Sequence, residues 1–185
     1  MAEPICSLAA GGVSANSSLT GTEFEVTPRV RFGILKRYKN IAMVGLSANP
    51  MRPSYFAATY LKNRGYNIIP VNPRATDILG RRCYPSLKEI ESPVDVVDIF
   101  RPSEHVPLIV EEAIEVGAKV IWMQFGVMHK EAARRALDAG LEVVMDQCMK
   151  VEHARFFGGL NAMGLNSGVL SSRGWSPGDG NKGLG

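Results

Sequence analysis

The residues best suited to chemistry in this chain are arginines that come soon after short apolar runs. Arg52, Arg74 and Arg101 each follow such a run, and Arg81 and Arg82 come a little later than Arg74. A guanidinium group matches phosphate oxygens in bidentate fashion, so several of them at one place favour a polyphosphate ligand. A single loop arginine is more often merely solvated, so a phosphate site requires several arginines at one edge of the fold.

The first of these arginines belongs to residues 40–59, NIAMVGLSANPMRPSYFAAT. We interpret this stretch as a buried strand, a turn at Gly45 and a helix with Ser54 as its N-cap. Such a unit presents free backbone N–H groups and the positive end of a helix dipole, to which Ser47 and Arg52 add side-chain donors. The stretch predicts a cradle for a phosphorylated ligand. An ordinary strand-to-helix turn remains the alternative, because the spacing differs from the dinucleotide pattern G-x-G-x-x-G.

Strands and helices alternate along the rest of the chain, with connections short enough for right-handed crossovers. We expect a single α/β domain with a Rossmann-like, doubly wound, mostly parallel sheet in the strand order 3-2-1-4-5-6. The expected strands are 41–44, 66–71, 80–84, 94–100, 119–123 and 141–145, and the expected helices begin at Pro28, Ser54, Pro85, Ser103 and Lys130. We assign residues 28–157 to this domain, 1–27 to a flexible extension and 158–185 to a Gly-, Asn- and Ser-rich tail.

Composition excludes several function classes. A net charge of +3 over 185 residues is too small to indicate nucleic acid as a partner. Cys6, Cys83 and Cys148 lie far apart, which argues against a disulfide framework and fits a reducing compartment. No apolar run approaches the ~20 residues of a membrane span, and the N-terminus makes a poor signal peptide. We expect a cytoplasmic protein with no metal site, since the three histidines have no metal-ligand spacing.

The loops after the strands differ in charge, and in such sheets ligands bind at that edge. The second strand ends at Asn72, followed by Pro73 and Arg74, where NAD would require an acidic residue for the ribose diol. A basic residue there suits a phosphorylated ribose, as in NADP or in coenzyme A with its 3′-phosphate. The loops of the fifth and sixth strands, with Gly126 and Cys148, are neutral or acidic. This layout suits a ligand with one phosphate-rich end and one long uncharged end.

Residues 38–153 resemble the single-domain CoA-binding proteins, which are related to the CoA-binding domain at the start of the succinyl-CoA synthetase α subunit. The resemblance is carried by IAMVGLSANPMRPSY, YNIIPVNP, VDVVDIFR, GAKVIWMQFGV and GLEVVMDQC, in that order. It implies a Rossmann-like domain that holds coenzyme A across the strand ends. The implied contacts are Gly45, Ser47, Arg52, Pro53 and Ser54 for the diphosphate, Asn72, Pro73 and Arg74 for the adenosine and 3′-phosphate, Phe100 and Arg101 for the middle, and Gln124, Gly126 and Val127 for the pantetheine.

The chain offers little catalytic chemistry. Ser47, in G-L-S-A-N, approximates the nucleophile elbow G-x-S-x-G, but the last glycine is missing and His153 is the only histidine placed to serve it. Asp95 is expected to mark the entry of a strand and Asp98 to be a buried, hydrogen-bonded carboxylate. We therefore expect a non-catalytic binding module for coenzyme A or acyl-CoA.

Cys148 follows the sixth strand, at the edge where the ligand is expected. About three inter-strand steps of ~4.8 Å separate the first strand from the sixth, which a pantetheine arm can cover. We hypothesise that Cys148 forms a mixed disulfide with coenzyme A, and a buried, inert thiol is the alternative. Two other functions are also compatible with the sequence. The protein could be an NADP-dependent oxidoreductase, or the nucleotide-binding part of an acyl-CoA ligase that acts with a partner subunit.

Overall fold

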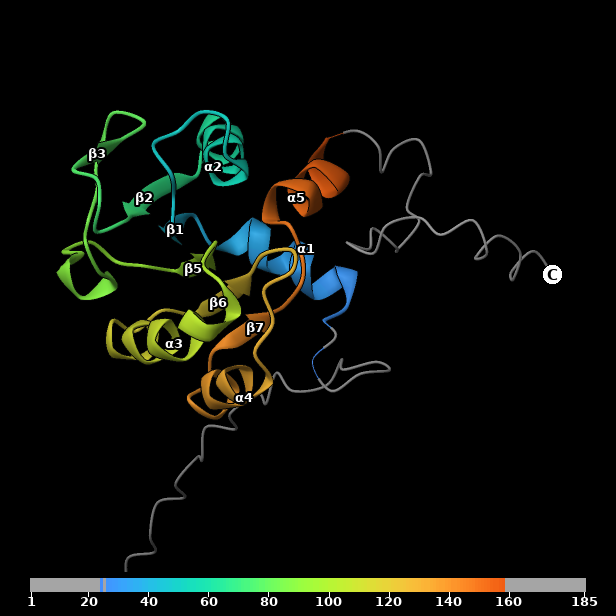
Figure 1. Cartoon of the computed structure of the whole chain (residues 1–185). Coiled ribbons are helices and arrows are strands. Elements are labelled where there is room, and N and C mark those ends of the chain that lie inside the picture. Colours follow the sequence, from blue (N-terminus) through green and yellow to red (C-terminus); the bar gives the residue numbers. More distant parts are fainter. Residues whose placement is uncertain (1–23, 25, 159–185) are drawn as a thin grey trace, which may run out of the picture.

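A parallel five-stranded sheet forms the centre of the computed structural model, which describes residue 24 and residues 26–158 (Figure 1). The strand order is β2-β1-β5-β6-β7, so the chain winds outward in both directions from β1. The strands are β1 (Asn40–Val44), β2 (Asn67–Val71), β5 (Val96–Ile99), β6 (Val120–Met123) and β7 (Glu142–Val144). This arrangement confirms the predicted α/β, Rossmann-like fold.

Helices cover both faces of the sheet, as Figure 1 shows. Successive strand residues point to opposite faces, so Ile41 and Met43 pack with one layer while Ala42 packs with the other. The first layer contains α1 (Pro28–Arg37), α2 (Pro53–Asn63) and α5 (Met149–Phe157), and the second contains α3 (Val106–Glu115) and α4 (Lys130–Asp138). Trp122 is fully buried in the first layer.

We predicted that residues 80–84 form a strand of the main sheet beside the second strand, and this pairing is wrong. The chain forms a two-stranded antiparallel hairpin, β3 (Asp77–Ile78) with β4 (Arg81–Arg82), which is separate from the main sheet. A single parallel bridge between Val71 and Tyr84 joins this region to β2. Pro70 gives a physical reason, because it has no N–H to donate to an outer neighbour of β2.

Several helix starts also differ from the predictions. The helix predicted to begin at Ser103 begins with a 3-10 turn, η2 (Ser103–His105), and α3 follows from Val106. The helical turn expected after Pro85 is a short 3-10 helix, η1 (Leu87–Glu89). The start of α1 at Pro28 is confirmed. The proposed extension, apart from residues 24, 26 and 27, and the proposed tail beyond Gly158 lie outside the described residues.

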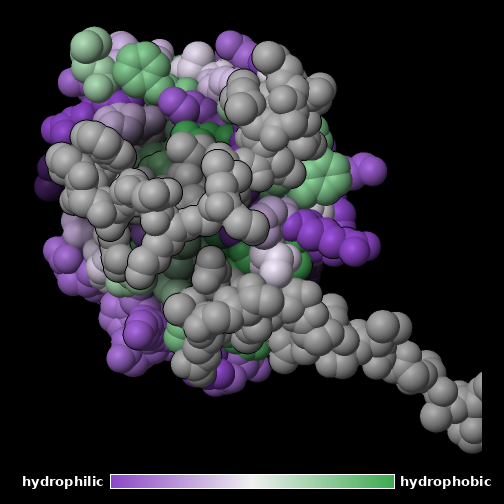
Figure 2. All heavy atoms as spheres, turned by 90° about the vertical axis from the view of Figure 1, so that its right-hand side faces the viewer, coloured by the Kyte–Doolittle hydropathy of each residue, from purple (hydrophilic) through white to green (hydrophobic). Residues whose placement is uncertain are grey.

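No helix among residues 24 and 26–158 is both long and apolar enough to pass through a bilayer. Figure 2 shows the side of the molecule that carries α5. Where described residues are visible on this side, hydrophobic surface appears in small areas between hydrophilic ones.

Candidate functional site

The loop after β1 is shaped by Gly45, whose φ of +86° lies in the left-handed region. The Gly45 N–H donates to the carbonyl of Val71 at 2.9 Å, which ties the ends of β1 and β2 together. A Cβ atom at Gly45 would lie 2.8 Å from Cδ of Arg101 and 3.3 Å from the carbonyl carbon of Phe100. Glycine is therefore needed both for the turn and for the close approach of the β5 loop.

The predicted helix N-cap is wrong. Helix α2 begins at Pro53 with Arg52 as the N-cap residue, and Ser54 is a buried residue of the first turn. The Ser54 hydroxyl accepts a hydrogen bond from the Ser47 N–H at 3.1 Å, which holds the loop against the start of the helix. Proline at position 53 also removes one N–H from the helix end.

Fewer loop N–H groups are free than the sequence suggested. The Asn49 N–H donates to the Ser47 hydroxyl, and the Met51 N–H donates to the Asn49 side chain. The N–H groups of Leu46 and Ala48 have no acceptor among the described residues. The loop therefore offers an anion fewer backbone N–H donors than predicted, and side-chain donors contribute a larger share.

Asn72 links two loops of the site through its side-chain amide. Its Nδ2 donates to the carbonyl of Leu46 at 2.8 Å, and its Oδ1 accepts from the Arg74 N–H at 2.9 Å. Pro73 and Arg74 are exposed at the rim beside it. Asn72 therefore positions the loops after β1 and β2, and the ligand contacts of Asn72, Pro73 and Arg74 stay predictions.

Three arginines at this edge have guanidinium groups without a bonded partner in the described part of the protein. The guanidinium groups of Arg52, Arg74 and Arg101 make no hydrogen bond or ion pair with any described residue. Since the structure gives them no counter-charge, all three remain available for an anionic ligand.

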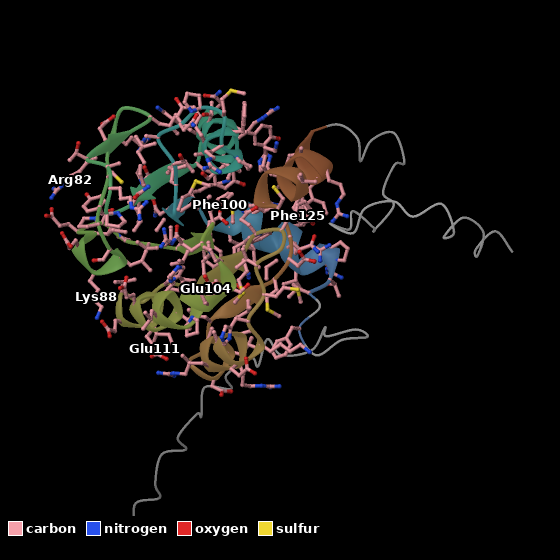
Figure 3. All side chains as sticks on the ribbon, viewed as in Figure 1. Arg82, Lys88, Phe100, Glu104, Glu111 and Phe125 are labelled. Carbon is pink, nitrogen blue, oxygen red and sulfur yellow. The ribbon has the colours of Figure 1, made fainter. Side chains whose placement is uncertain are left out.

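Arg81 and Arg82 are not part of this group. Arg81 donates to Oδ1 of Asn67 at 2.5 Å on the outer side of β2, and Arg82 lies 4.9 Å from the Tyr84 ring centroid. In Figure 3, Arg82 projects from the hairpin side of the molecule, far from Phe100. The hypothesis that the later arginines also face the ligand edge is not supported.

A hollow of about 180 Å³ lies at the carboxyl ends of β1, β2 and β5. This volume is below the roughly 300–1,000 Å³ of sites that enclose a drug-sized ligand, so the hollow suits one ring system of a larger ligand. It is lined by Val44, Gly45, Val71, Pro73, Pro85, Ser86, Arg101, His105, Leu108, Ile109 and Glu112.

Eight lining residues were not among the predicted contacts, and four of these eight are His105, Leu108, Ile109 and Glu112. These four come from η2 and the first turns of α3. These four residues are separated by three, one and three positions, a spacing that places them on one face of a helix. This helical spacing is the sequence signal that could have identified them. One wall of the hollow therefore comes from η2 and α3 and not from a loop at the end of a strand.

The pantetheine side holds predicted residues that are mostly buried. The Gln124 and Val127 side chains point into the protein, and the Gly126 N–H donates to Oδ1 of Asp146 at 2.8 Å. Phe125 is partly exposed and, like Phe100, follows a strand at this edge (Figure 3). The predicted contacts of Gln124, Gly126 and Val127 with the pantetheine stay predictions.

Cys148 is partly exposed and precedes the first residue of α5. Burial raises the pKa of the Cys148 thiol, the Val151 N–H lowers it, and the negative charge of Asp98 raises it further. The thiol is therefore protonated at neutral pH. Its place after β7, three strands from β1, agrees with the predicted geometry.

The structure does not bring the possible catalytic pair together. The Ser47 hydroxyl accepts from the Asn49 N–H, whereas Nδ1 of His153 lies 3.1 Å from the Tyr60 hydroxyl. His153 is buried among aromatic rings. Burial lowers the pKa of His153 to about 4, with smaller contributions from nearby cations. His129 is the N-cap residue of α4, and its ring accepts a hydrogen bond from the Ala132 N–H.

The parallel sheet and its ligand edge define a Rossmann-like nucleotide-binding domain. Residues 39–154 match the CoA binding domain family, and the chain belongs to this family. A Bacillus subtilis relative, the uncharacterized protein YneT, is 46% identical over 121 residues, which cover 65% of this chain and 90% of YneT.

Two further comparisons place the domain. A hypothetical protein from Pyrococcus horikoshii OT3 has a solved structure with a TM-score of 0.71 and 40% identity, covering 75% of this chain and 98% of that one. Subunit alpha of an ADP-forming acetate–CoA ligase II from Pyrococcus furiosus is 28% identical over 124 residues, covering 61% of this chain but 27% of the subunit. The same domain thus occurs both as most of a small protein and as a minor part of a ligase subunit.

Proposed function

We propose that this chain binds coenzyme A or an acyl-CoA at the carboxyl edge of the sheet and performs no catalysis of its own. The observation that carries the proposal is the group of three arginines, Arg52, Arg74 and Arg101, which have no described counter-charge at one edge. Coenzyme A carries its charge at the diphosphate and the 3′-phosphate, and its other end is uncharged. Membership in the CoA binding domain family supports the choice of this nucleotide over NADP.

The three arginines suggest how the ligand is oriented. Arg52, at the start of α2, suits the diphosphate, because the helix dipole there also favours negative charge. Arg74 suits the 3′-phosphate beside the hollow, whose wall includes Pro73 and Leu108. The pantetheine then runs toward β6 and β7 and ends near Cys148, where a mixed disulfide can form.

A calorimetric titration of the full chain with coenzyme A, dephospho-coenzyme A, NADP and NAD tests the proposal. We expect coenzyme A to bind most tightly. Arg52→Ala removes a charge-assisted contact of about 1.5–3 kcal/mol, so the affinity should fall by about 10- to 150-fold. NADP binding without coenzyme A binding would refute the proposal and favour an oxidoreductase.

Arg64→Ala is a matched control for this variant. Arg64 is the C-cap residue of α2, at the other end of an 11-residue helix about 16 Å long. The two variants lose the same formal charge, but only Arg52 lies at the proposed site. Equal losses of affinity would show that the effect is one of net charge rather than of contact.

A role beside a ligase subunit is a second candidate, favoured by the match to subunit alpha of the Pyrococcus furiosus acetate–CoA ligase II. Under this alternative the chain supplies the CoA site and a partner supplies the chemistry. Affinity purification of the tagged full chain from its host tests it. An ATP-dependent ligase subunit in stoichiometric amount would support the alternative, and the chain alone would count against it.

A further inference from the structure

The outer edge of β2 includes a residue whose backbone N–H and C=O have no partner. In a parallel strand, alternate residues turn both groups toward the same neighbouring strand. The Asn67 N–H donates to the carbonyl of Lys39, just before β1, so Asn67 faces β1 and Ile68 faces away from it. The N–H and C=O of Ile68 make no hydrogen bond with any described residue. Ile68 is 1% exposed, and unpaired backbone groups in such a residue are rare in folded proteins.

These groups lack a partner because the segment outside β2 pairs with it over one residue. The Tyr84 N–H donates to the Pro70 carbonyl at 2.9 Å, and the Tyr84 carbonyl accepts from the Asn72 N–H at 2.8 Å. Two residues upstream, Arg82 belongs to the β3–β4 hairpin and does not pair with β2. Ile68 is therefore left without the outer neighbour that Pro70 has.

A groove of about 230 Å³ lies beside this part of β2. Its lining includes Ile68 and Pro70 on one side and Arg81, Arg82 and Tyr84 on the other. The open position next to Ile68 thus borders on an accessible space. The groove shares no lining residue with the hollow at the carboxyl ends of β1, β2 and β5, so the two sites are separate.

The charged side chains that line the groove are arginines. The guanidinium group of Arg82 lies over the Tyr84 ring, and Figure 3 shows Arg82 at the outer margin of the hairpin side. Its ion pair with Glu91 is 4.0 Å long, and the two side chains are 68% and 83% exposed, so this contact neutralises Arg82 weakly. Arg81 donates to the neutral side chain of Asn67 and forms no ion pair with a described residue. The groove therefore favours an occupant with negative charge.

We propose that this edge of β2 binds an extended, acidic segment of a partner protein by strand addition. The segment accepts a hydrogen bond from the Ile68 N–H and donates one to the Ile68 carbonyl. Its Asp or Glu side chains contact Arg81 and Arg82, which supply charge-assisted bonds. Because the open part of the edge is short, the backbone bonds are few, and the acidic side chains contribute much of the affinity.

The same charges argue against a second copy of this chain as the occupant. Two copies joined edge to edge through β2 would bring Arg81 and Arg82 of one copy close to those of the other. Like charges that face each other across paired strands are destabilising. An acidic partner removes this repulsion, whereas a second copy creates it.

The test titrates the full chain with three fluorescent heptapeptides. The first is TVEVEVT, the second is its uncharged counterpart TVQVQVT, and the third is TVEVEVT with methyl groups on its three central amide nitrogens. We expect the first peptide to bind best. The second should bind about 5-fold more weakly because it lacks the acidic groups, and the third about 2- to 10-fold more weakly because it lacks a backbone donor.

Amide hydrogen exchange followed by NMR locates the contact. With TVEVEVT at about ten times its Kd, exchange of the Ile68 N–H should slow by about 10-fold. The Asn67 N–H is the internal control, because it is already bonded to Lys39 and should not change. This measurement needs no substitution at Ile68, whose buried side chain belongs to the core.

Two arginine variants separate contact from net charge. Arg82→Ala should weaken TVEVEVT by about 2- to 5-fold and leave TVQVQVT unchanged. Arg29→Ala is the matched control: Arg29 is an exposed residue of α1, so the variant loses the same formal charge outside the groove. Equal losses in the two variants would contradict a contact at the groove.

Three results would overturn the inference. They are an unchanged exchange rate at Ile68, equal binding of TVEVEVT and TVQVQVT, and a dimer of the chain that protects the Ile68 N–H without any peptide. Coenzyme A at saturation should leave the affinity for TVEVEVT unchanged. Displacement of the peptide by coenzyme A would assign the groove to the nucleotide and also overturn the inference. A chain that binds the peptide but not coenzyme A would refute the proposed function and leave this inference intact.

Discussion

Replacing Gly45 by alanine tests whether the turn after β1 serves the ligand as well as the fold. Gly45 and Gly140 have nearly the same φ, +86° and +85°, so alanine at either position bears a similar conformational cost of about 1–2 kcal/mol. For a chain of this size each kcal/mol corresponds to about 2–4 °C in Tm. Nothing lies within 4 Å of a Cβ at Gly140, whereas at Gly45 it would meet Cδ of Arg101 at 2.8 Å.

The difference between the two variants should appear mainly in binding. The Arg101 side chain can move aside, but the backbone at Phe100, 3.3 Å from the new Cβ, must also shift slightly, so Gly45→Ala should lose somewhat more stability than Gly140→Ala. Moving Arg101 away from an anion removes a charge-assisted contact of about 1.5–3 kcal/mol, which corresponds to a 10- to 150-fold loss of CoA affinity. Gly140→Ala should keep wild-type affinity. Thermal unfolding and calorimetric titration measure both quantities, and equal affinity in the two variants would refute the reasoning.

The remaining predictions concern single side chains. Arg74→Ala should weaken coenzyme A by about 10-fold or more in titrations while leaving dephospho-coenzyme A unchanged, since the 3′-phosphate is its proposed partner; equal losses for both ligands would contradict this. The pKa of Asp98 is raised in the folded state, so its contribution to stability is present below about pH 4 and is lost as the pH rises through 7; urea unfolding of Asp98→Asn should show a shallower fall over that range. Glu152→Ala leaves two buried arginines without their carboxylate and should cost about 3–5 kcal/mol. Glu142→Ala, which breaks an exposed ion pair, should cost less than about 1 kcal/mol in the same assay.

The fold was predictable because its signals are local and repeated. Short apolar runs such as residues 41–44 are buried on both faces, and turn residues such as Gly45 and Gly117 mark where each run or helix ends. The order of the main strands is that of the doubly wound fold, which the alternation of strands and helices indicates. The hairpin at 77–82 was not predictable in this way, because Pro70 alters the outer edge of β2 and the alternative pairing involves only two residues in each strand.

The site was predicted less completely than the fold. Sequence position indicates which residues follow a strand, but not which of them are already bonded within the protein. Ser54 and Asn72 have the right position and polarity, yet their side chains hold the loops together. His105 and Glu112 were missed because α3 presents them to the hollow from a helix rather than from a strand-end loop.

The two halves of the ligand edge suggest different tasks for the two ends of the ligand. Around β1, β2 and β5, Arg52, Arg74 and Arg101 have no described counter-charge, so most of the affinity should come from the nucleotide. Around β6 and β7 the Gly126 N–H is bonded to Asp146, so few polar groups remain for the pantetheine. A thiol arm held by few contacts can leave and return while the nucleotide stays bound. A disulfide to Cys148 would then hold the pantetheine end in place, where the non-covalent contacts are few.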